Sequence, residues 1–157
     1  VIDPGGARRN HTPTFNSNAK EPVMAMTSSS NFMRNVLIAD SISCLGSGAL
    51  QVAFTGAMAS LLGLPAQLLM ASGVFLLAYG AFVGWLSTRR PAPRPIIWLL
   101  VVGNLGWAAG CLLLLVSGYV APTALGVAWV VIQELTVSVL AQLQWLGLRA
   151  TSSQAWA

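Results

Sequence analysis

Two carboxylic acids lie inside long apolar segments of this 157-residue sequence, and they are the side chains best suited to chemistry there. Asp40 lies near the start of the first apolar segment and Glu134 near the middle of the last one. An ionised carboxylate far from water is costly unless a proton, a partner or water compensates for the lost hydration. No Lys, Arg or His lies at the depth of Glu134. We therefore expect Glu134 to be protonated and to donate a hydrogen bond to Asn104, Gln51 or a carbonyl group.

Small polar side chains accompany both acids. On a helix, Asp40, Cys44, Ser47 and Gln51 fall within one narrow sector, which should face the interior of a helical bundle because lipid contact would be unfavourable. Asn104 is expected at a similar depth to Ser47 and Gln51. The sequence therefore predicts a candidate intramembrane polar site made of Glu134, Asn104, Gln51, Ser47 and Asp40.

The two acids allow different interpretations. Glu134 fits either a proton or cation site, or a hydrogen bond between helices or between subunits. For Asp40, about one turn from the nearer end of its segment, we favour a structural or interfacial role. Its partners would be interfacial water, or Gln142 and Gln144 on the last segment.

Other chemistry is missing from the apolar segments. The single histidine, His11, lies in the polar N-terminal stretch, so no membrane histidine can ligate haem, a pigment or a metal. The sequence contains no CxxC pair, no Gly-rich phosphate loop and no serine nucleophile motif. We expect neither a cofactor nor catalysis.

The composition indicates that lipid surrounds most of the chain. Hydrophobic residues make up 55% and charged residues 8%, whereas a soluble domain carries about 25% charged residues. Four apolar segments reach the roughly 20 residues needed to cross a bilayer. The predicted fold is an all-α transmembrane four-helix bundle in residues 34–150, with spans at about 36–62, 66–86, 96–116 and 123–148. Residues 1–33 are predicted to be a disordered tail, part of it upstream of the natural start, and residues 151–157 a short C-terminal tail.

Positive charge predicts the orientation. All eight Lys and Arg residues flank the same ends of the spans, before the first, between the second and third, and after the fourth. Such residues mark the cytoplasmic side, so both termini are predicted to be cytoplasmic. The links at 63–65 and 117–122 are short enough to make two antiparallel hairpins. Trp85, Trp98 and Trp145 are expected to form an aromatic belt at the cytoplasmic face. The same confinement of charge favours anionic lipid over nucleic acid as a partner.

Packing is predicted to depend on small residues, because lipid gives no hydrophobic force between helices. Small-residue faces are expected at Gly80 and Gly84 on the second span and at Gly106 and Gly110 on the third. The first span carries a similar ridge at Ala39, Ser43 and Ser47. Cys44 and Cys111 should differ in depth by about 10 Å, too far apart for a disulfide.

Three stretches carry a resemblance to a known group of proteins. They are Arg34-Asn35-Val36-Leu37-Ile38-Ala39-Asp40, Leu62-Gly63-Leu64-Pro65 and the run from Gln142 to Arg149. They resemble uncharacterised small bacterial four-span integral membrane proteins, over about residues 33–150. The resemblance implies four helices in a bacterial inner membrane and supplies no activity. Small multidrug exporters also have four spans and a membrane carboxylate. Theirs lies in the first span, whereas the midplane acid here lies in the fourth.

Two functions remain open from the sequence. The first is a non-catalytic accessory or structural subunit that docks on a larger bacterial membrane complex or self-associates. The second is a small proton-coupled transporter that uses Glu134. Small-residue faces and the lack of reactive groups favour the first.

Overall fold

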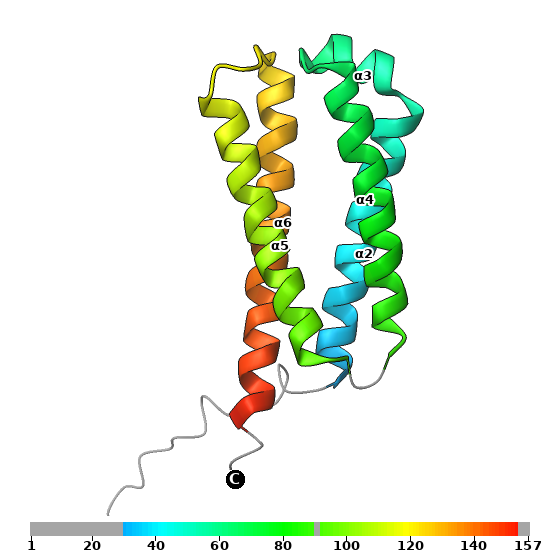
Figure 1. The fold of residues 1–157 in the computed structure, drawn as a ribbon, viewed down its shortest axis with the longest axis vertical. Coiled ribbons are helices and arrows are strands. Elements are labelled where there is room, and N and C mark those ends of the chain that lie inside the picture. The colour runs from blue at the N-terminus through cyan, green and yellow to red at the C-terminus, as the bar shows by residue number, and fades with distance from the viewer. Residues whose placement is uncertain (1–29, 90–91, 154–157) are drawn as a thin grey trace, which may run out of the picture.

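The computed structural model describes residues 30–89 and 92–153, and within them it contains five α-helices and no strand (Figure 1). They are α2 (Ser30–Ala53), α3 (Thr55–Leu62), α4 (Ala66–Ser87), α5 (Arg94–Val116) and α6 (Ala124–Ser153). The helices α2, α4, α5 and α6 are long and apolar enough to cross a membrane. The predicted all-α class with four spans is therefore confirmed. The predicted tails lie outside the described residues, except for 30–33 and 151–153, which belong to α2 and α6.

The first predicted span, 36–62, ends where α3 ends, at Leu62, but it differs from the structure in its start and in its continuity. The helix begins at Ser30, earlier than expected, and it is interrupted at Phe54, whose φ of −121° and ψ of 28° are not helical. At this break the hydroxyl of Thr55 donates to the carbonyl oxygen of Gln51 at 2.5 Å. A side-chain hydroxyl that donates to a helix carbonyl oxygen in this way competes with the backbone N–H for that oxygen and bends the helix. The excess length of the segment is therefore folded into the separate helix α3.

The helices form two closely packed pairs. The most extensive contacts are between α2 and α4 and between α5 and α6. Between the pairs, α2 and α3 contact α6, whereas the backbones of α4 and α5 stay apart. We call the end that holds the start of α2, the α4–α5 link and the end of α6 the lower end, as it lies in Figure 1. The opposite end, with α3 and the α5–α6 link, is the upper end.

Glycines bring α2 and α4 close together. A Cβ atom placed on Gly48 would lie 2.8 Å from the carbonyl oxygen of Gly73, and one on Gly80 would lie 2.9 Å from Leu45 Cγ. The hydroxyl of Ser41 donates to the carbonyl oxygen of Gly80 at 2.8 Å, and the predicted packing residue Gly84 faces the same hydroxyl. Small residues thus let the two backbones approach, as membrane helix pairs require.

The small-residue face predicted on α5 does not pack against another helix. A Cβ atom at Gly106 or Gly110 would meet nothing within 4 Å. Phe75 of α4 and Trp107 of α5 stack between the two helices with their ring centres 5.6 Å apart, which keeps the backbones separated. Ser43 and Ser47, two residues of the ridge predicted on the first span, border a small cavity near α6.

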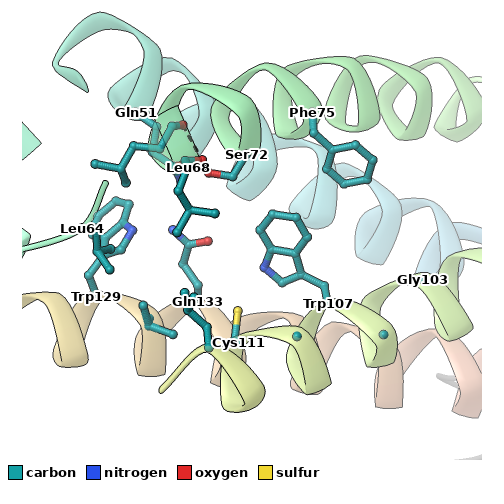
Figure 2. Close-up of a pocket in the computed structure, with 15 residues that line it drawn as sticks. Gln51, Leu64, Leu68, Ser72, Phe75, Gly103, Trp107, Cys111, Trp129 and Gln133 are labelled. Atoms are coloured by element: carbon teal, nitrogen blue, oxygen red, sulfur yellow. Dashed lines mark hydrogen bonds between the residues drawn. The ribbon is translucent and has the colours of Figure 1, made fainter. Parts of the chain in front are cut away.

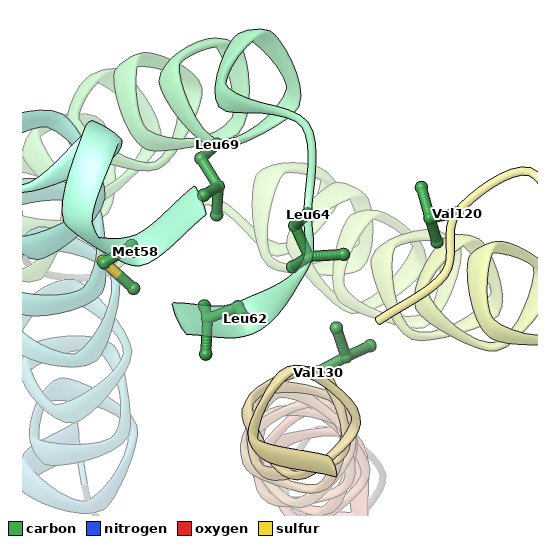
Figure 3. Packing of buried hydrophobic residues seen from close by; sticks show 6 residues of the cluster. All are labelled: Met58, Leu62, Leu64, Leu69, Val120 and Val130. Carbon is green, nitrogen blue, oxygen red and sulfur yellow. The ribbon is translucent and has the colours of Figure 1, made fainter. Parts of the chain in front are cut away.

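Apolar clusters close the bundle at both ends. At the upper end, α3, α4, α6 and the links meet in one cluster, shown in Figure 3: Met58, Leu62, Leu64, Leu69, Val120 and Val130. There Thr123 also ties the two pairs together, because its backbone N–H donates to the Leu62 carbonyl at 2.9 Å. Its hydroxyl donates to the carbonyl of Leu61 at 2.8 Å. Two further clusters at the lower end join α2 to α4 and α5, and α5 to α6: Leu37, Val83, Leu86 and Leu100, and Ile97, Val101, Ala141 and Leu148.

The outer surface is apolar along most of its length. Leu99, Leu113 and Ile132 are each more than half exposed. Water would not tolerate such a surface on four helices, so the described part of the chain contacts a lipid bilayer.

Candidate functional site

Asp40 is the centre of a buried group of polar side chains. The residue has no exposed surface. Its Oδ2 accepts a hydrogen bond from Gln144 Nε2 at 2.8 Å, with Asn104 Nδ2 at 3.4 Å and the Tyr79 hydroxyl at 3.5 Å. Its Oδ1 accepts from the Cys44 thiol at 3.5 Å. We call these five residues the Asp40 cluster.

All four spans contribute to the Asp40 cluster. Asp40 and Cys44 lie one turn apart on α2, and Tyr79, Asn104 and Gln144 come from α4, α5 and α6. Asn104 also donates to Gln144 Oε1 at 3.4 Å. A hydroxyl has one proton to donate, and Tyr79 lies closer to Asn104 Oδ1, at 3.1 Å, than to Asp40. The Gln144 bond is therefore the strongest that Asp40 receives, and it joins the first span to the last.

The structure brings together Asp40 and Asn104 but not the other predicted site residues. Among the described residues, Glu134 accepts one side-chain hydrogen bond, from Ser138 on its own helix at 3.4 Å. Gln51 accepts one from Ser72 of α4 at 2.6 Å. The predicted grouping of Asn104 and Gln51 around Glu134 is therefore not what the structure shows.

The depth of each residue explains this difference. Asp40 lies ten residues beyond Ser30, the first residue of α2, and Asn104 lies ten residues beyond Arg94, the first residue of α5. At about 1.5 Å per residue, both are about 15 Å from the lower end. The prediction began the first span at Val36, six residues after the helix start that the structure shows. Gln144, one of the two glutamines expected near Asp40, does contact it, whereas Gln142 is exposed.

A cavity of about 450 Å³ lies between the two helix pairs, nearer the upper end (Figure 2). Apolar and aromatic side chains make most of its wall, and a few polar groups interrupt them. The residues that matter for its chemistry are Gln51, Ser72, Phe75, Trp107, Trp129 and Gln133. Gly106 and Gly110, which pack against no helix, also line it.

A row of three aromatic rings connects this cavity to the Asp40 cluster. Trp107 stacks on Phe75 with an angle of 7° between the ring planes, and Phe75 stacks on Tyr79 at 6.1 Å between ring centres. Trp107 lines the cavity, and Tyr79 reaches Asp40. A molecule that displaced Trp107 would therefore act on the side chains that surround the carboxylate.

A second, smaller cavity of about 70 Å³ lies between α2 and α6. Its polar wall includes Ser43, Ser47, Gln133 and Thr136. The candidate site residue Ser47 is found here, away from the Asp40 cluster. Trp107, Trp129 and Gln133 border both cavities.

No protein-family model, curated protein or solved structure matches this chain. What the site can do is therefore inferred from its own atoms. Within residues 30–89 and 92–153, no three His, Cys, Asp or Glu side chains come close enough together to hold a metal ion. Cys44 and Cys111 are both free, as expected from their depths. The Asp40 cluster offers one carboxylate and several neutral donors, which suit hydrogen bonding between helices or the binding of a proton.

The sequence analysis missed Tyr79 and Trp107. A signal existed for each, because a phenol or indole in the middle of an apolar span carries a polar group that needs a partner when buried. Tyr79 is one of only two tyrosines in the chain. Its position within the second span could have predicted a polar partner at that depth.

Proposed function

We propose that the chain is a non-catalytic membrane protein that acts by association with another transmembrane helix, either in a larger membrane complex or in a second copy of itself. The observation that supports this proposal is the outward face of α2. Ala39, Gly46, Ala49 and Ala53 are exposed there, and Ile42 lies among them. Their spacing alternates between three and four residues, which is the seam of two helices packed side by side.

The α4-facing side of α2 and the outward faces of α5 and α6 differ from this face. The side of α2 that faces α4 is already packed against that helix at Ser41 and Gly48. The outward faces of α5 and α6 carry bulky side chains such as Leu99, Leu113 and Ile132, which suit contact with lipid chains. A Cβ atom at Gly46 would meet nothing within 4 Å. A partner helix could therefore approach α2 as closely as α4 does.

The test enlarges one residue on this face. Gly46→Leu fills the seam without touching the chain's own packing, and Ala128→Leu adds bulk to an exposed position on α6 as the matched control. After extraction in a mild detergent, native mass spectrometry should find the wild-type chain in an assembly. The Gly46 variant should be a monomer, and the control should still assemble. Masses that are multiples of the chain indicate self-association, and other masses indicate a different subunit. A monomeric wild-type chain, or assembly that survives Gly46→Leu, would contradict the proposal.

The proposed location is a bacterial cytoplasmic membrane with the lower end inside. Four arginines of the described part of the chain lie at that end: Arg34, Arg89, Arg94 and Arg149. Arg89 and Arg149 cover the rings of Trp85 and Trp145 at 4.5 Å and 4.7 Å, as expected for residues at the edge of a bilayer. A cysteine introduced at Thr88, with Cys44 and Cys111 replaced by Ser, should be protected from an impermeant maleimide added outside cells. One at Tyr119 should react, and the reverse pattern would contradict this orientation.

One observation favours the second candidate, a small proton-coupled transporter. A fully buried carboxylate lies at the junction of all four spans, and the row of aromatic rings joins it to a cavity. In such a transporter Asp40, rather than Glu134, would bind the proton. Proton flux into proteoliposomes, followed with a trapped pH dye, should then be lost in Asp40→Asn and retained in Glu134→Gln. The opposite pattern would exclude this role for Asp40.

A further inference from the structure

The larger cavity contains a hydrogen-bond donor that lacks an acceptor. Trp107 Nε1 is buried, and no hydrogen-bond partner for it exists among the described residues. Figure 2 shows the indole nitrogen on the side of the ring where Gln133 extends its amide. Buried N–H groups almost always have a partner, because leaving one unpaired is unfavourable. The indole N–H therefore lacks an acceptor in the wall of this cavity.

The wall of the cavity suits a flat ring. Trp107 is already stacked on Phe75, so its ring plane is fixed. Trp129 stands elsewhere on the wall, as Figure 2 shows. Along α5 the wall includes three glycines, which have no side chain to fill the space, beside Trp107, Cys111 and Leu114: Gly103, Gly106 and Gly110. Aromatic rings and bare backbone together give flat surfaces, on which a planar molecule makes more contact than a branched one.

The cavity lies among the four spans, where lipid rather than water surrounds the protein. It is walled by α4 and α5, whose backbones do not contact each other. Phe75, which lines the cavity from α4, is 53% exposed. A molecule that enters from lipid must first dissolve in the membrane. Its volume of about 450 Å³ lies within the roughly 300–1,000 Å³ of pockets that hold small molecules.

We propose that this cavity binds a small, lipid-soluble molecule that combines a planar aromatic ring with a ketone-type acceptor, whose oxygen accepts from Trp107 Nε1. The inference goes beyond the proposed association through α2, which lies on a different face of the protein. A lipid acyl chain is the competing occupant. It carries no acceptor along its length, so it would fill the cavity and leave the indole N–H unpaired.

The test uses two probes that differ only in the acceptor. Fluorenone is a planar aromatic ketone, and fluorene has the same rings with a methylene group in place of the carbonyl. Their binding to the full chain in lipid nanodiscs would be measured by equilibrium dialysis, with empty nanodiscs to correct for partition into lipid. We expect saturable binding of fluorenone, tighter than that of fluorene. The Trp107→Phe variant keeps a ring beside Phe75 but removes the donor. It should weaken fluorenone binding by about two- to tenfold, the range of one hydrogen bond, and leave fluorene unchanged.

A second pair of variants tests the location and does not depend on Trp107. Gly106→Leu places a side chain in the cavity without a clash, since a Cβ atom there meets nothing within 4 Å. It should abolish binding of both probes. Ala109→Leu adds the same bulk to an exposed position on α5 outside the cavity wall and should leave binding unchanged.

Three results would overturn the proposal. Equal affinity for the two probes in the wild-type chain would remove the role of the acceptor. Fluorenone binding that survives Gly106→Leu would place the site elsewhere. A tightly held phospholipid that copurifies with the chain, together with no saturable fluorenone binding, would assign the cavity to an acyl chain.

Discussion

Replacing Asp40 by Ala should loosen all four spans at once, because this carboxylate accepts hydrogen bonds from side chains of α4, α5 and α6. The change leaves Gln144 Nε2 buried without its acceptor, and Asn104 Nδ2 keeps only its 3.4 Å contact with Gln144 Oε1. Glu134→Ala is the matched control. It also removes an acid from a span, but the described bond it breaks comes from Ser138 on the same helix.

The magnitude follows from the bond lengths. Side-chain hydrogen bonds between membrane helices average about 0.6 kcal/mol and reach about 1.7 kcal/mol. The 2.8 Å bond from Gln144 belongs near the upper figure, and the 3.4 Å contact from Asn104 belongs near the average. We therefore expect Asp40→Ala to lower the free energy of unfolding by about 2 kcal/mol. Asp40→Asn presents an amide oxygen to the same donors and loses mainly the Cys44 contact, so its loss should stay below about 1 kcal/mol.

The assay is reversible unfolding in mixed detergent micelles, with circular dichroism as the signal and Glu134→Ala expected within about 0.6 kcal/mol of the wild-type chain. The comparison of Asp40→Asn with Asp40→Ala separates two roles of the carboxylate. If shape and hydrogen bonding matter, the Asn variant stays near the wild type. Equal losses in the two variants would show that the charge, not the bonds, holds the helices. An Asp40→Ala chain as stable as the wild type would refute the structural role altogether.

Three further changes test the packing, each measured by the same unfolding assay. Gly48→Leu should cost about 1–3 kcal/mol, because its side chain enters the space of the Gly73 carbonyl, whereas Gly46→Leu should be neutral because it points outward. Gly63→Ala should cost about 1–2 kcal/mol, because the backbone there has a φ of 66°, which disfavours any Cβ atom. Thr123→Val should cost about 1 kcal/mol, since the hydroxyl accepts from the Gly126 N–H at the start of α6 and donates to the Leu61 carbonyl. A Gly48→Leu variant with an unchanged free energy of unfolding would show that α2 and α4 can separate without a loss of stability.

The number of spans could be predicted from the sequence because the bilayer sets a minimum length for each apolar segment. The start of the first helix could not. Residues 30–35 are polar or mixed, and local composition placed them largely in a tail. In the structure Met33 packs against both apolar clusters at the lower end and lies close to Gly147 of α6. Contacts with distant residues extend the helix there, and most helical stability in proteins comes from such packing rather than from local preference.

Which residues lie together in the site was harder to predict than which polar residues face the bundle interior. The sequence correctly identified Asp40 and Asn104 as polar residues of the bundle interior, and Gln144 as a residue near Asp40. It could not match Asn104 to Asp40, because the relative depth of residues on two spans is set by how the helices pack against each other and so needs a structure.

The surroundings of the glycines in the structure show why a small-residue motif does not by itself predict a contact between helices. Gly80 and Gly84 on α4 meet the backbone and a serine of α2, whereas Gly106 and Gly110 on α5 have the same spacing and meet no side chain. The difference lies in the residues beside them. Trp107 extends from α5 toward α4 and stacks on Phe75, so it sets the distance between these helices by the thickness of two rings. Since the bundle is closed by apolar clusters at both ends, the space left beside those glycines cannot collapse without breaking one of them. The cavity is therefore maintained by the fold itself, and an occupant would stabilise the chain without first having to open it.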